Sequence, residues 1–226
     1  APSLIRDNRP DMCGVVGIAS IRGMSTPDRA VLSRMVGAIR HRGPDDEGYF
    51  VAPGIGLGHA RLSIIDVAGG KQPIHNEDQT AWICYNGEIF NYVELRSDLE
   101  KRGHKFYTST DTEVVVHLYE EYGDEFVHRL NGQFAICIWD EKRRRLVLAR
   151  DRVGILPLYY AETGDKLVFG YEVKAILASG LVEPQLDKTG FDDLLTFWCP
   201  VAPQTVFAGI RQVKPGEMVT LRDGVV

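Results

Sequence analysis

The sequence has few cysteines and no long apolar run. Its four cysteines, Cys13, Cys84, Cys137 and Cys199, are far apart and form no C-x-x-C pair. Such spacing does not predict a zinc site, and a chain of 226 residues needs no disulfides to fold. No apolar stretch reaches the about 18 residues of a membrane span, and no signal-peptide core is visible. We therefore expect a cytoplasmic domain with no membrane segment, no bound metal and no cofactor of its own.

The chain also lacks an excess of positive charge. It carries 26 Lys and Arg against 31 Asp and Glu, for a net charge of −5. Its basic residues are dispersed except for the run at 142–145, which predicts the solvated turn of a hairpin, so no nucleic-acid partner is expected. With 44% hydrophobic residues, the chain can bury a core large enough for one domain, which we favour over two small ones.

A short apolar run at 12–20 carries a cysteine at its head, and its composition predicts a buried strand. Cys13 has two interpretations. It is a structural core thiol, or it is a nucleophile that needs a base, because a thiol with a pKa of ~8.5 is mostly protonated at neutral pH. No histidine is close in sequence. The α-amine of Cys13 itself has a suitable pKa of ~8 if Met12 and the residues before it are removed.

The remaining pattern mixes several strands with a few helices. A helix is expected to start near Asp28 and to end before Gly43, and others are expected at 93–102, from 114 to before Gly123, and at 188–198. The alternating and apolar segments predict strands at 49–52, 55–62, 80–85, 134–139, 145–149, 159–160, 167–169 and 217–221. So many neighbouring strands indicate a layered α/β fold with largely antiparallel sheets.

Short sequence patterns predict individual turns, helix caps and close contacts. Asn86-Gly87 predicts a turn after a strand, and Asn91 and Asp111 are each expected to cap a helix. The glycines at 54–58 have the wrong spacing for a phosphate-binding loop, and no helix pattern follows them. We interpret that segment as a strand that approaches another part of the backbone closely. A hairpin at 217–226 is interrupted by the last residue, so we expect the parent chain to continue.

Several ordered blocks resemble one family. They are C-G-V-V-G at 13–17, H-R-G-P-D-D-E-G at 41–48, A-R-L-S-I-I-D at 60–66, N-G-E-I-F-N-Y at 86–92, D-R-V-G-I-L-P-L-Y-Y at 151–160 and E-V-K-A-I-L at 172–177. Together they are similar to the glutaminase domain of asparagine synthetase, a class II glutamine amidotransferase of the N-terminal-nucleophile hydrolases. The resemblance implies two stacked, mainly antiparallel sheets flanked by helices, and it implies L-glutamine as the substrate.

The resemblance also implies roles for individual residues. Cys13 would form a thioester with the side-chain acyl group of glutamine, while the side chain of Asn86 and the backbone N–H of Gly87 stabilise the oxyanion. Arg61 would bind the α-carboxylate of glutamine, and Glu88 and Asp111 would face its α-ammonium group. The backbone around Leu62, Ser63, Ile64 and Ile65 would line the same pocket.

The domain boundaries follow from the same comparison. Residues 1–12 are expected to be a leader or tail, and residues 13–226 the glutaminase domain. No S-G-G-x-D-S-type loop is present, so ATP and Mg²⁺ would belong to a synthetase domain that follows this chain or sits in a partner subunit; a homodimer is also considered. Leu156 stands where the family usually has lysine, and Gly170-Tyr171 where it usually has Ala-Ser. We expect these departures to lie at the partner-domain face, which leaves the ammonia acceptor open between aspartate and another carboxylate.

Two other functions remain compatible with the residues. An uncleaved leader would silence Cys13 and leave a non-catalytic binding or scaffold module. A hydrolase of the same fold could instead act on a different amide, although Arg61, Glu88 and Asp111 favour glutamine.

Overall fold

A computed structural model of the chain describes residues 13–62 and 70–226. Its strands are β1 (Gly14–Ser20), β2 (Asp46–Ala52), β3 (Ile55–Arg61), β4 (Ile74–His75), β5 (Ala81–Ile89), β6 (Gly132–Asp140), β7 (Arg145–Arg150), β8 (Tyr159–Thr163), β9 (Lys166–Gly170), β10 (Ile210–Gln212) and β11 (Met218–Leu221). Its helices are α1 (Arg29–Ala38), α2 (Tyr92–Lys101), α3 (Asp111–Tyr122), α4 (Val173–Ala178) and α5 (Lys188–Phe197), with short 3₁₀ turns η1 (Arg40–Arg42) and η2 (Gly123–Arg129).

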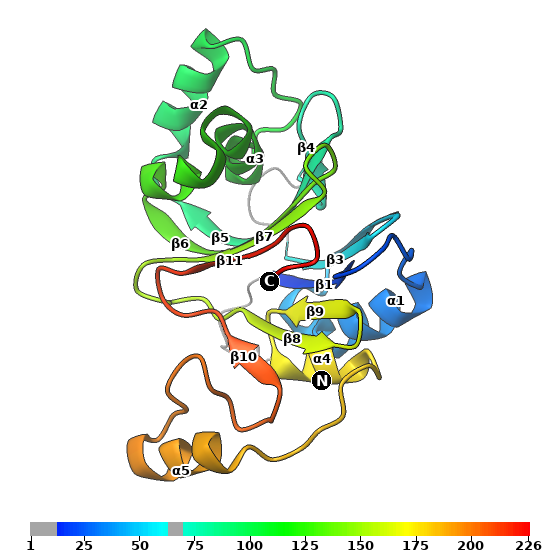
Figure 1. The fold of residues 1–226 in the computed structure, drawn as a ribbon. Helices are drawn as coiled ribbons and strands as arrows, with labels where there is room; N and C mark the ends of the chain where they lie inside the picture. The colour runs from blue at the N-terminus through cyan, green and yellow to red at the C-terminus, as the bar shows by residue number, and fades with distance from the viewer. Residues whose placement is uncertain (1–12, 63–69) are drawn as a thin grey trace, which may run out of the picture.

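The described strands form two sheets that stack face to face. One has the order β10-β8-β9-β1-β3-β2 and the other the order β11-β7-β6-β5-β4, and every paired neighbour is antiparallel. Helices α1 and α4 pack beside the first sheet, while α2 and α3 cover the outer face of the second (Figure 1). The predicted layered fold, with two mainly antiparallel sheets flanked by helices, is confirmed.

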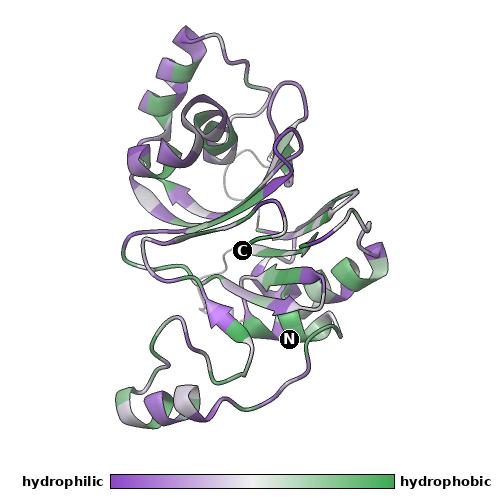
Figure 2. Cartoon of the chain, in the orientation of Figure 1, coloured by the Kyte–Doolittle hydropathy of each residue, from purple (hydrophilic) through white to green (hydrophobic). Residues whose placement is uncertain are grey.

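Side chains of β1 alternate between two cores, as the two-residue period of a strand requires. Val15 and Ala19 face the core between the sheets, while Val16 and Ile18 face the core under α1 and α4. Both faces of β1 are therefore buried, which explains why its sequence is continuously apolar. Figure 2 shows the hydrophobic colour along much of the two sheets, the hydrophilic colour on the edge strand β10, and a mostly hydrophilic colour on the exposed helix α2.

Helix α1 begins where the sequence predicted. Asp28 is its N-cap, and its side chain accepts a hydrogen bond from the N–H of Ala30. The buried side chains of α1 fill the space over the glycines of β3, because a Cβ at Gly56 would press on Leu32 and one at Gly58 would press on Val36. The interpretation of this glycine segment as a strand is confirmed. The predicted close approach to another part of the backbone is wrong, because Gly56 and Gly58 leave room for side chains of α1 instead.

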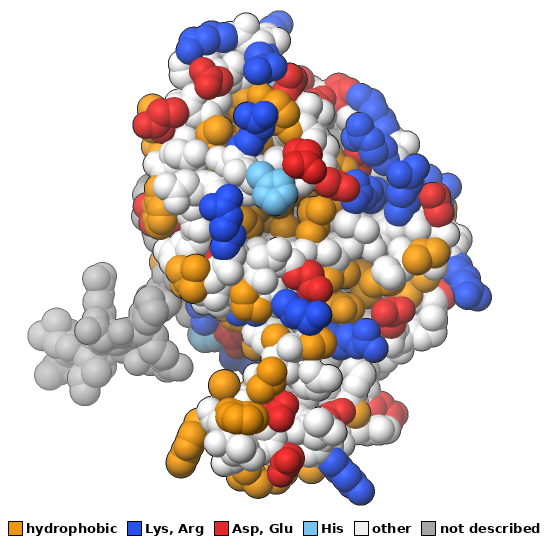
Figure 3. Space-filling view, turned by 60° about the vertical axis from the view of Figure 1, so that its left-hand side comes forward, with side chains coloured by type: hydrophobic (Ala, Val, Ile, Leu, Met, Phe, Trp, Pro, Cys, Tyr) orange, Lys and Arg blue, Asp and Glu red, His pale blue; other side chains and the backbone are white. Residues whose placement is uncertain are grey.

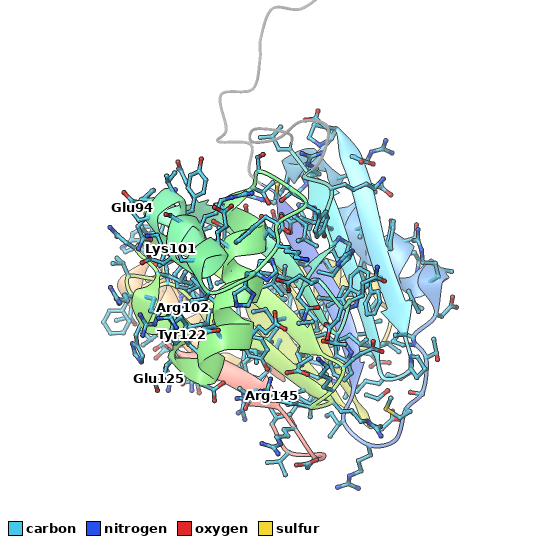
Figure 4. All side chains as sticks on the ribbon, turned by 90° about the horizontal axis from the view of Figure 1, so that it is seen from above. Glu94, Lys101, Arg102, Tyr122, Glu125 and Arg145 are labelled. Atoms are coloured by element: carbon cyan, nitrogen blue, oxygen red, sulfur yellow. The ribbon has the colours of Figure 1, made fainter. Side chains whose placement is uncertain are left out.

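Helix α3 packs its apolar side against the second sheet, and α2 lies beside α3. Arg102, which follows α2, lies over the ring of Tyr122 on α3, with 5.5 Å from the guanidinium carbon to the ring centroid (Figure 4). The N-cap of α3 is Thr110, whose hydroxyl accepts from the N–H of Glu113. The predicted cap at Asp111 is therefore wrong by one position, and the carboxylate of Asp111 is left for other contacts.

One further local prediction is wrong, and another holds only in part. Asn86-Gly87 is not a turn, because β5 continues to Ile89 and pairs with β6 through Asn86–Ala135 and Gly87–Phe134. Asn91 is the N-cap residue of α2, as predicted, but its side chain makes no capping hydrogen bond. Its side chain instead donates to the carbonyl of Arg129 and accepts from the N–H of Asn131, and so joins two loops. In both cases long-range pairing outweighs a local sequence preference.

The basic run at 142–145 lies in the β6–β7 turn, as predicted, and acidic partners balance its charge. Lys142 pairs with Asp78, Arg143 with Asp140, and Arg145 with Asp124.

Two departures from the family pattern are buried. The expectation that Leu156 and Tyr171 lie at a partner face is wrong, since each is only 3% exposed and belongs to the core between the sheets. None of the helices within the described ranges has the length and apolar character needed to cross a bilayer.

Gly17→Ala tests how tightly the core side chains pack over β1 within the first sheet. A Cβ at Gly17 would overlap the ring of Phe169 and crowd the carbonyl oxygen of Gly56, so we expect this variant to lower the free energy of unfolding by about 1–3 kcal/mol. The matched control is Gly37→Ala in α1, where a Cβ meets nothing within 4 Å. We expect the control to be stabilised by about 0.5–1 kcal/mol. Urea denaturation of both variants measures this, and equal stabilities would contradict the tight contact.

Candidate active site

Cys13 lies immediately before β1 and faces the end of β3. Because Gly14 pairs with Ala60, the next residues along the two strands, Cys13 and Arg61, come together. The Sγ of Cys13 lies 3.3 Å from the N–H of Leu62, which donates to it, and 3.5 Å from the Leu62 carbonyl oxygen. Burial is the main reason that the pKa of the Cys13 thiol is raised, although the Leu62 N–H and Arg61 oppose the rise. The thiol is therefore protonated at neutral pH and needs a base.

The histidines suggested by the sequence do not supply that base. His59 on β3 is fully buried, its Nε2 lies 3.2 Å from the carbonyl oxygen of Tyr85, and burial lowers its pKa to about 4. The Nδ1 of His75 lies 2.7 Å from the carbonyl oxygen of Asn76, and its ring stacks on Tyr107. Among the residues that the structure describes, the hydrogen bonds of the Cys13 thiol are with Leu62 alone. A basic group supplied by Cys13 itself remains the nearest candidate.

Cys13 opens into a cavity of about 240 Å³ between the two sheets and the N-terminus of α3. The cavity brings together seven of the predicted site residues, which come from four separate segments of the chain. Its lining consists of Cys13, Arg61, Leu62, Gly70, Gln72, Tyr85, Asn86, Gly87, Glu88, Thr110, Asp111, Thr112 and Gln133. The predicted residues Ser63, Ile64 and Ile65 lie outside the described residues.

Asn86 contributes a buried donor to this cavity. It is 3% exposed, and its Nδ2 has no hydrogen-bond partner among the described residues, although it lies near the Tyr171 hydroxyl. A buried amide without a partner is costly, unless a ligand accepts from it. The site can therefore stabilise an oxygen that develops negative charge beside Asn86.

Gly87 is required by the sheet as well as by the cavity. Its φ of 148° is in the region that favours glycine, and a Cβ at this position would overlap the carbonyl oxygen of Gln133 on β6. The close pairing of β5 with β6 therefore explains this glycine without reference to a ligand.

Asp111 is the first residue of α3 and points back toward β5. Its Oδ2 accepts from the Tyr85 hydroxyl at 2.8 Å and from the Ile89 N–H at 3.0 Å. Burial is the main cause that raises the pKa of Asp111, against the effect of these donors. A buried carboxylate of this kind gains most from a positively charged ligand, because a nearby cation offsets the loss of hydration.

The other two charged residues of the cavity differ in solvent exposure. Arg61 is 6% exposed at the end of β3, whereas Glu88 is exposed on β5 at the cavity rim. The cavity thus offers a buried guanidinium and two carboxylates, a set suited to a zwitterionic ligand.

Sequence reasoning missed several lining residues, of which Gln72 is the most connected. Its Oε1 accepts from the N–H of Tyr85 at 2.6 Å, and its Nε2 donates to the hydroxyl of Thr112 at 3.4 Å. Gln72 therefore ties β5 to α3 across the cavity. Tyr85 and Thr112 are sequence neighbours of Asn86 and Asp111, which was the available signal. Gln72 has no such signal, since only the fold brings it to the site.

A family model described as a glutamine amidotransferase domain matches residues 12–226. The chain belongs to this family. Two relatives from Bacillus subtilis (strain 168) are the glutamine-hydrolyzing asparagine synthetases 3 and 1, which are 37% identical over 218 residues and 40% identical over 213 residues. These matches cover 95% and 93% of this chain but 36% and 34% of the relatives. The glutamine amidotransferase domain described here thus spans about a third of their length.

A solved structure supports the same architecture. The allosteric regulatory enzyme of purine biosynthesis matches with a TM-score of 0.67 and 23% identity, over 93% of this chain and 47% of that one. At this identity the likeness shows the fold alone, and it supports the predicted arrangement of two stacked antiparallel sheets flanked by helices.

A larger cavity of about 430 Å³ lies elsewhere, beside the β6–β7 turn. Its lining includes Arg22, Trp139, Lys142 and Asp223 but none of the predicted site residues. We place the candidate active site in the smaller cavity because the Cys13 thiol, the Asn86 amide without a partner among the described residues, and the buried charges meet there.

His59 makes the stability of the fold depend on pH. Its folded pKa of about 4 lies below the ordinary 6.5, so between these values the unfolded chain binds a proton that the folded chain does not. Stability must therefore fall as pH decreases through this window. We expect His59→Gln to remove about 2 kcal/mol of the loss in unfolding free energy between pH 7 and pH 5.

Urea denaturation at the two pH values measures the effect. The control is His128→Gln, because the His128 side chain is 70% exposed. The same pH dependence in the wild type and both variants would show that His59 is not held neutral by burial.

Proposed function

We propose that this domain hydrolyses the side-chain amide of L-glutamine to glutamate and ammonia through a thioester on Cys13. The observation that carries the proposal is the unpaired amide of Asn86 in the same cavity as the buried thiol of Cys13. Membership of the glutamine amidotransferase family supports the same chemistry.

The reaction needs a nucleophile, an oxyanion donor and a proton carrier. The Sγ of Cys13 attacks the amide carbon, and the resulting oxyanion is stabilised by the Asn86 Nδ2 and the Gly87 N–H. The C–N bond then breaks, and the amine that took the thiol proton returns it to the leaving ammonia. Water attacks the thioester, releases glutamate and restores the thiol.

The proton carrier is the α-amine of Cys13, which exists only after residues 1–12 are removed. While Met12 is attached, the nitrogen of Cys13 belongs to a planar amide whose lone pair is delocalised. The raised pKa of the thiol makes a free amine essential, since too little thiolate forms without one.

The amino-acid end of glutamine is recognised by charge. Arg61 binds the α-carboxylate, with the backbone of Leu62 beside it. Asp111 and Glu88 face the α-ammonium group, and the buried position of Asp111 makes that pairing stronger than one at the surface. Hydrolysis of a different amide is less well supported, because a simple amide offers no partner for these three charges.

The ammonia is used by a second domain. Because the synthetase relatives are about three times longer than this chain, we propose that a synthetase domain, carrying ATP and Mg²⁺, follows it or belongs to a partner subunit. Aspartate is the default acceptor, and another carboxylate is the alternative. The assembly would be cytoplasmic, with a homodimer as a further proposal.

The region around α5 supports a partner domain. Leu195, Phe197 and Trp198 are 67%, 59% and 90% exposed, which is unusual for large apolar side chains. Figure 3 shows hydrophobic side chains gathered on the lobe at the bottom, which contains α5 in Figure 1.

Removal of residues 1–12 is the decisive test of the mechanism. We expect a chain that starts at Cys13 to release ammonia from glutamine, and a chain that retains residues 1–12 to be inactive although folded, because its Cys13 nitrogen is not basic. Intact mass identifies the form present, circular dichroism checks the fold, and an ammonia assay measures activity.

The control is Cys13→Ala in the shortened chain, which should bind glutamine but release no ammonia. Full activity with residues 1–12 attached would exclude the α-amine as the base. A folded, glutamine-binding chain that is inactive in both forms would support the non-catalytic module instead.

Variants at the two ends of glutamine should separate catalysis from binding. Asn86→Ala removes an oxyanion donor, so we expect kcat to fall about 100- to 1000-fold with little change in KM. Arg61→Ala removes a charged hydrogen bond to the substrate, so we expect KM to rise about 10- to 100-fold. Steady-state ammonia release by chains starting at Cys13 measures both constants. If Asn86→Ala instead lost folding stability and activity in parallel, its role would be structural.

A further inference from the structure

A cluster of imidazole and carboxylate groups lies away from the active-site cavity. It comprises Glu77 in the β4–β5 turn, His104 in the loop between α2 and α3, and His117 and Glu120 on α3. His117 and Glu120 are three residues apart, so they share one face of the helix. One ligand atom from each of the four side chains lies within 4.8 Å of the others. The fold thus brings three separate segments to one point.

The spacing of these atoms matches a tetrahedral metal site. The Nδ1 of His104 and the Nδ1 of His117 lie 3.2 Å and 3.3 Å from the two carboxylate oxygens of Glu77. The same nitrogens lie 3.8 Å and 3.7 Å from the Oε2 of Glu120. Ligands bonded at about 2.0–2.1 Å to a tetrahedral Zn²⁺ are about 3.3–3.4 Å apart. Small side-chain movements would therefore close the site.

The central side chain lacks hydrogen bonds. His117 is fully buried, and neither of its ring nitrogens has a hydrogen-bond partner among the described residues. The Oε2 of Glu120 is also buried without one. The carboxylates of Glu77, Glu113 and Glu120 lie within ion-pair distance of the His117 nitrogens, but not in hydrogen-bonding geometry. Buried polar atoms without a hydrogen bond are rare, and a bound ligand or ion is one explanation for them.

The charge around His117 also suits a cation. The carboxylates of Glu77, Glu113 and Glu120 lie 3.3, 3.6 and 3.7 Å from its ring nitrogens. The negative charge of these groups attracts a divalent metal, which would displace the imidazole proton to solvent.

We propose that Glu77, His104, His117 and Glu120 form a structural site for a divalent transition metal, with Zn²⁺ as the best match. Two imidazole nitrogens and two carboxylate oxygens are ligands that Zn²⁺ accepts in a closed four-coordinate site. Ca²⁺ and Mg²⁺ prefer all-oxygen sites with more ligands, and they fit two imidazoles poorly.

Outer contacts hold the ligands in place. Asn76 donates to the Oε1 of Glu120 at 3.0 Å, and the N–H of Lys105 donates to the Oε1 of Glu77 at 2.8 Å. The Nε2 of His117 lies 3.6 Å from the Oε1 of Glu113. A carboxylate behind a metal-bound imidazole is the usual outer partner, because it fixes the tautomer and the ring orientation.

The metal would tie the loop before α3 to the helix itself. Glu113 accepts from the N–H of Tyr107 and from the N–H and hydroxyl of Thr108, close to Thr110 and Asp111. A metal on His117 would therefore order the segment that leads to the active-site cavity, while taking no part in the reaction.

Metal binding by the purified protein tests the proposal. We would treat the protein with a chelator, titrate it with Zn²⁺ and measure metal content by elemental analysis and Tm by thermal denaturation. Changing Cys13→Ala and Cys199→Ser first removes the accessible thiols. We expect one Zn²⁺ per chain and a Tm rise of about 5–10 °C when free Zn²⁺ is about 100 times its Kd. Co²⁺ should give the visible absorption of a tetrahedral site.

Glu120→Gln and His104→Gln should each weaken Zn²⁺ binding at least about 100-fold, while the metal-free Tm changes little because both side chains are only partly buried. The matched controls are Glu125→Gln and His128→Gln, a histidine–glutamate pair that is 70–77% exposed and should leave binding unchanged. The proposal would be overturned if the protein failed to take up one metal per chain, or if the cluster variants and the controls bound Zn²⁺ equally. The four residues would then form a charge cluster without a metal.

Discussion

The face-to-face contact of two antiparallel sheets is the constraint on which the rest of the molecule depends. Pairing of β1 with β3 sets Cys13 beside Arg61 and Leu62, but it supplies only one wall of a cavity. The opposite wall, with Asn86 and Gly87, belongs to β5 in the other sheet. Any change in the packing of the inter-sheet core would therefore move Cys13 relative to Asn86.

Burial shifts the pKa values of acidic and basic groups near this contact in opposite directions. It raises the pKa of the Cys13 thiol and of the Asp111 carboxyl, and it lowers that of the His59 imidazole, so each neutral form is favoured. An apolar setting thus leaves the cavity with little reactivity until a substrate with its own charges enters. Burial also explains why the nearby imidazole of His59 is a poor base.

Sequence patterns predicted the elements better than they predicted the contacts between them. The buried strand β1, the hairpin turn at 142–145 and the start of α1 follow from local composition, and the structure confirms them. The turn expected at Asn86-Gly87 was wrong because β6 extends the pairing of β5, a long-range effect that local propensity cannot report. Gln72 and the cluster of Glu77, His104, His117 and Glu120 were missed for the same reason, since their partners are distant in sequence. The roles of Arg61, Glu88 and Asp111 stay predictions.

The position of β1 in its sheet affects how the protein folds during synthesis. β1 leaves the ribosome first among the described strands, yet it is a central strand whose two neighbours are β3 and β9. β9 ends at Gly170, about 150 residues after β1 ends, so at about 5–20 residues per second one edge of this apolar strand stays open for roughly 8–30 s. An open apolar edge is a site for pairing with other chains. Expression with slow translation or without chaperones should therefore favour aggregation over the native fold.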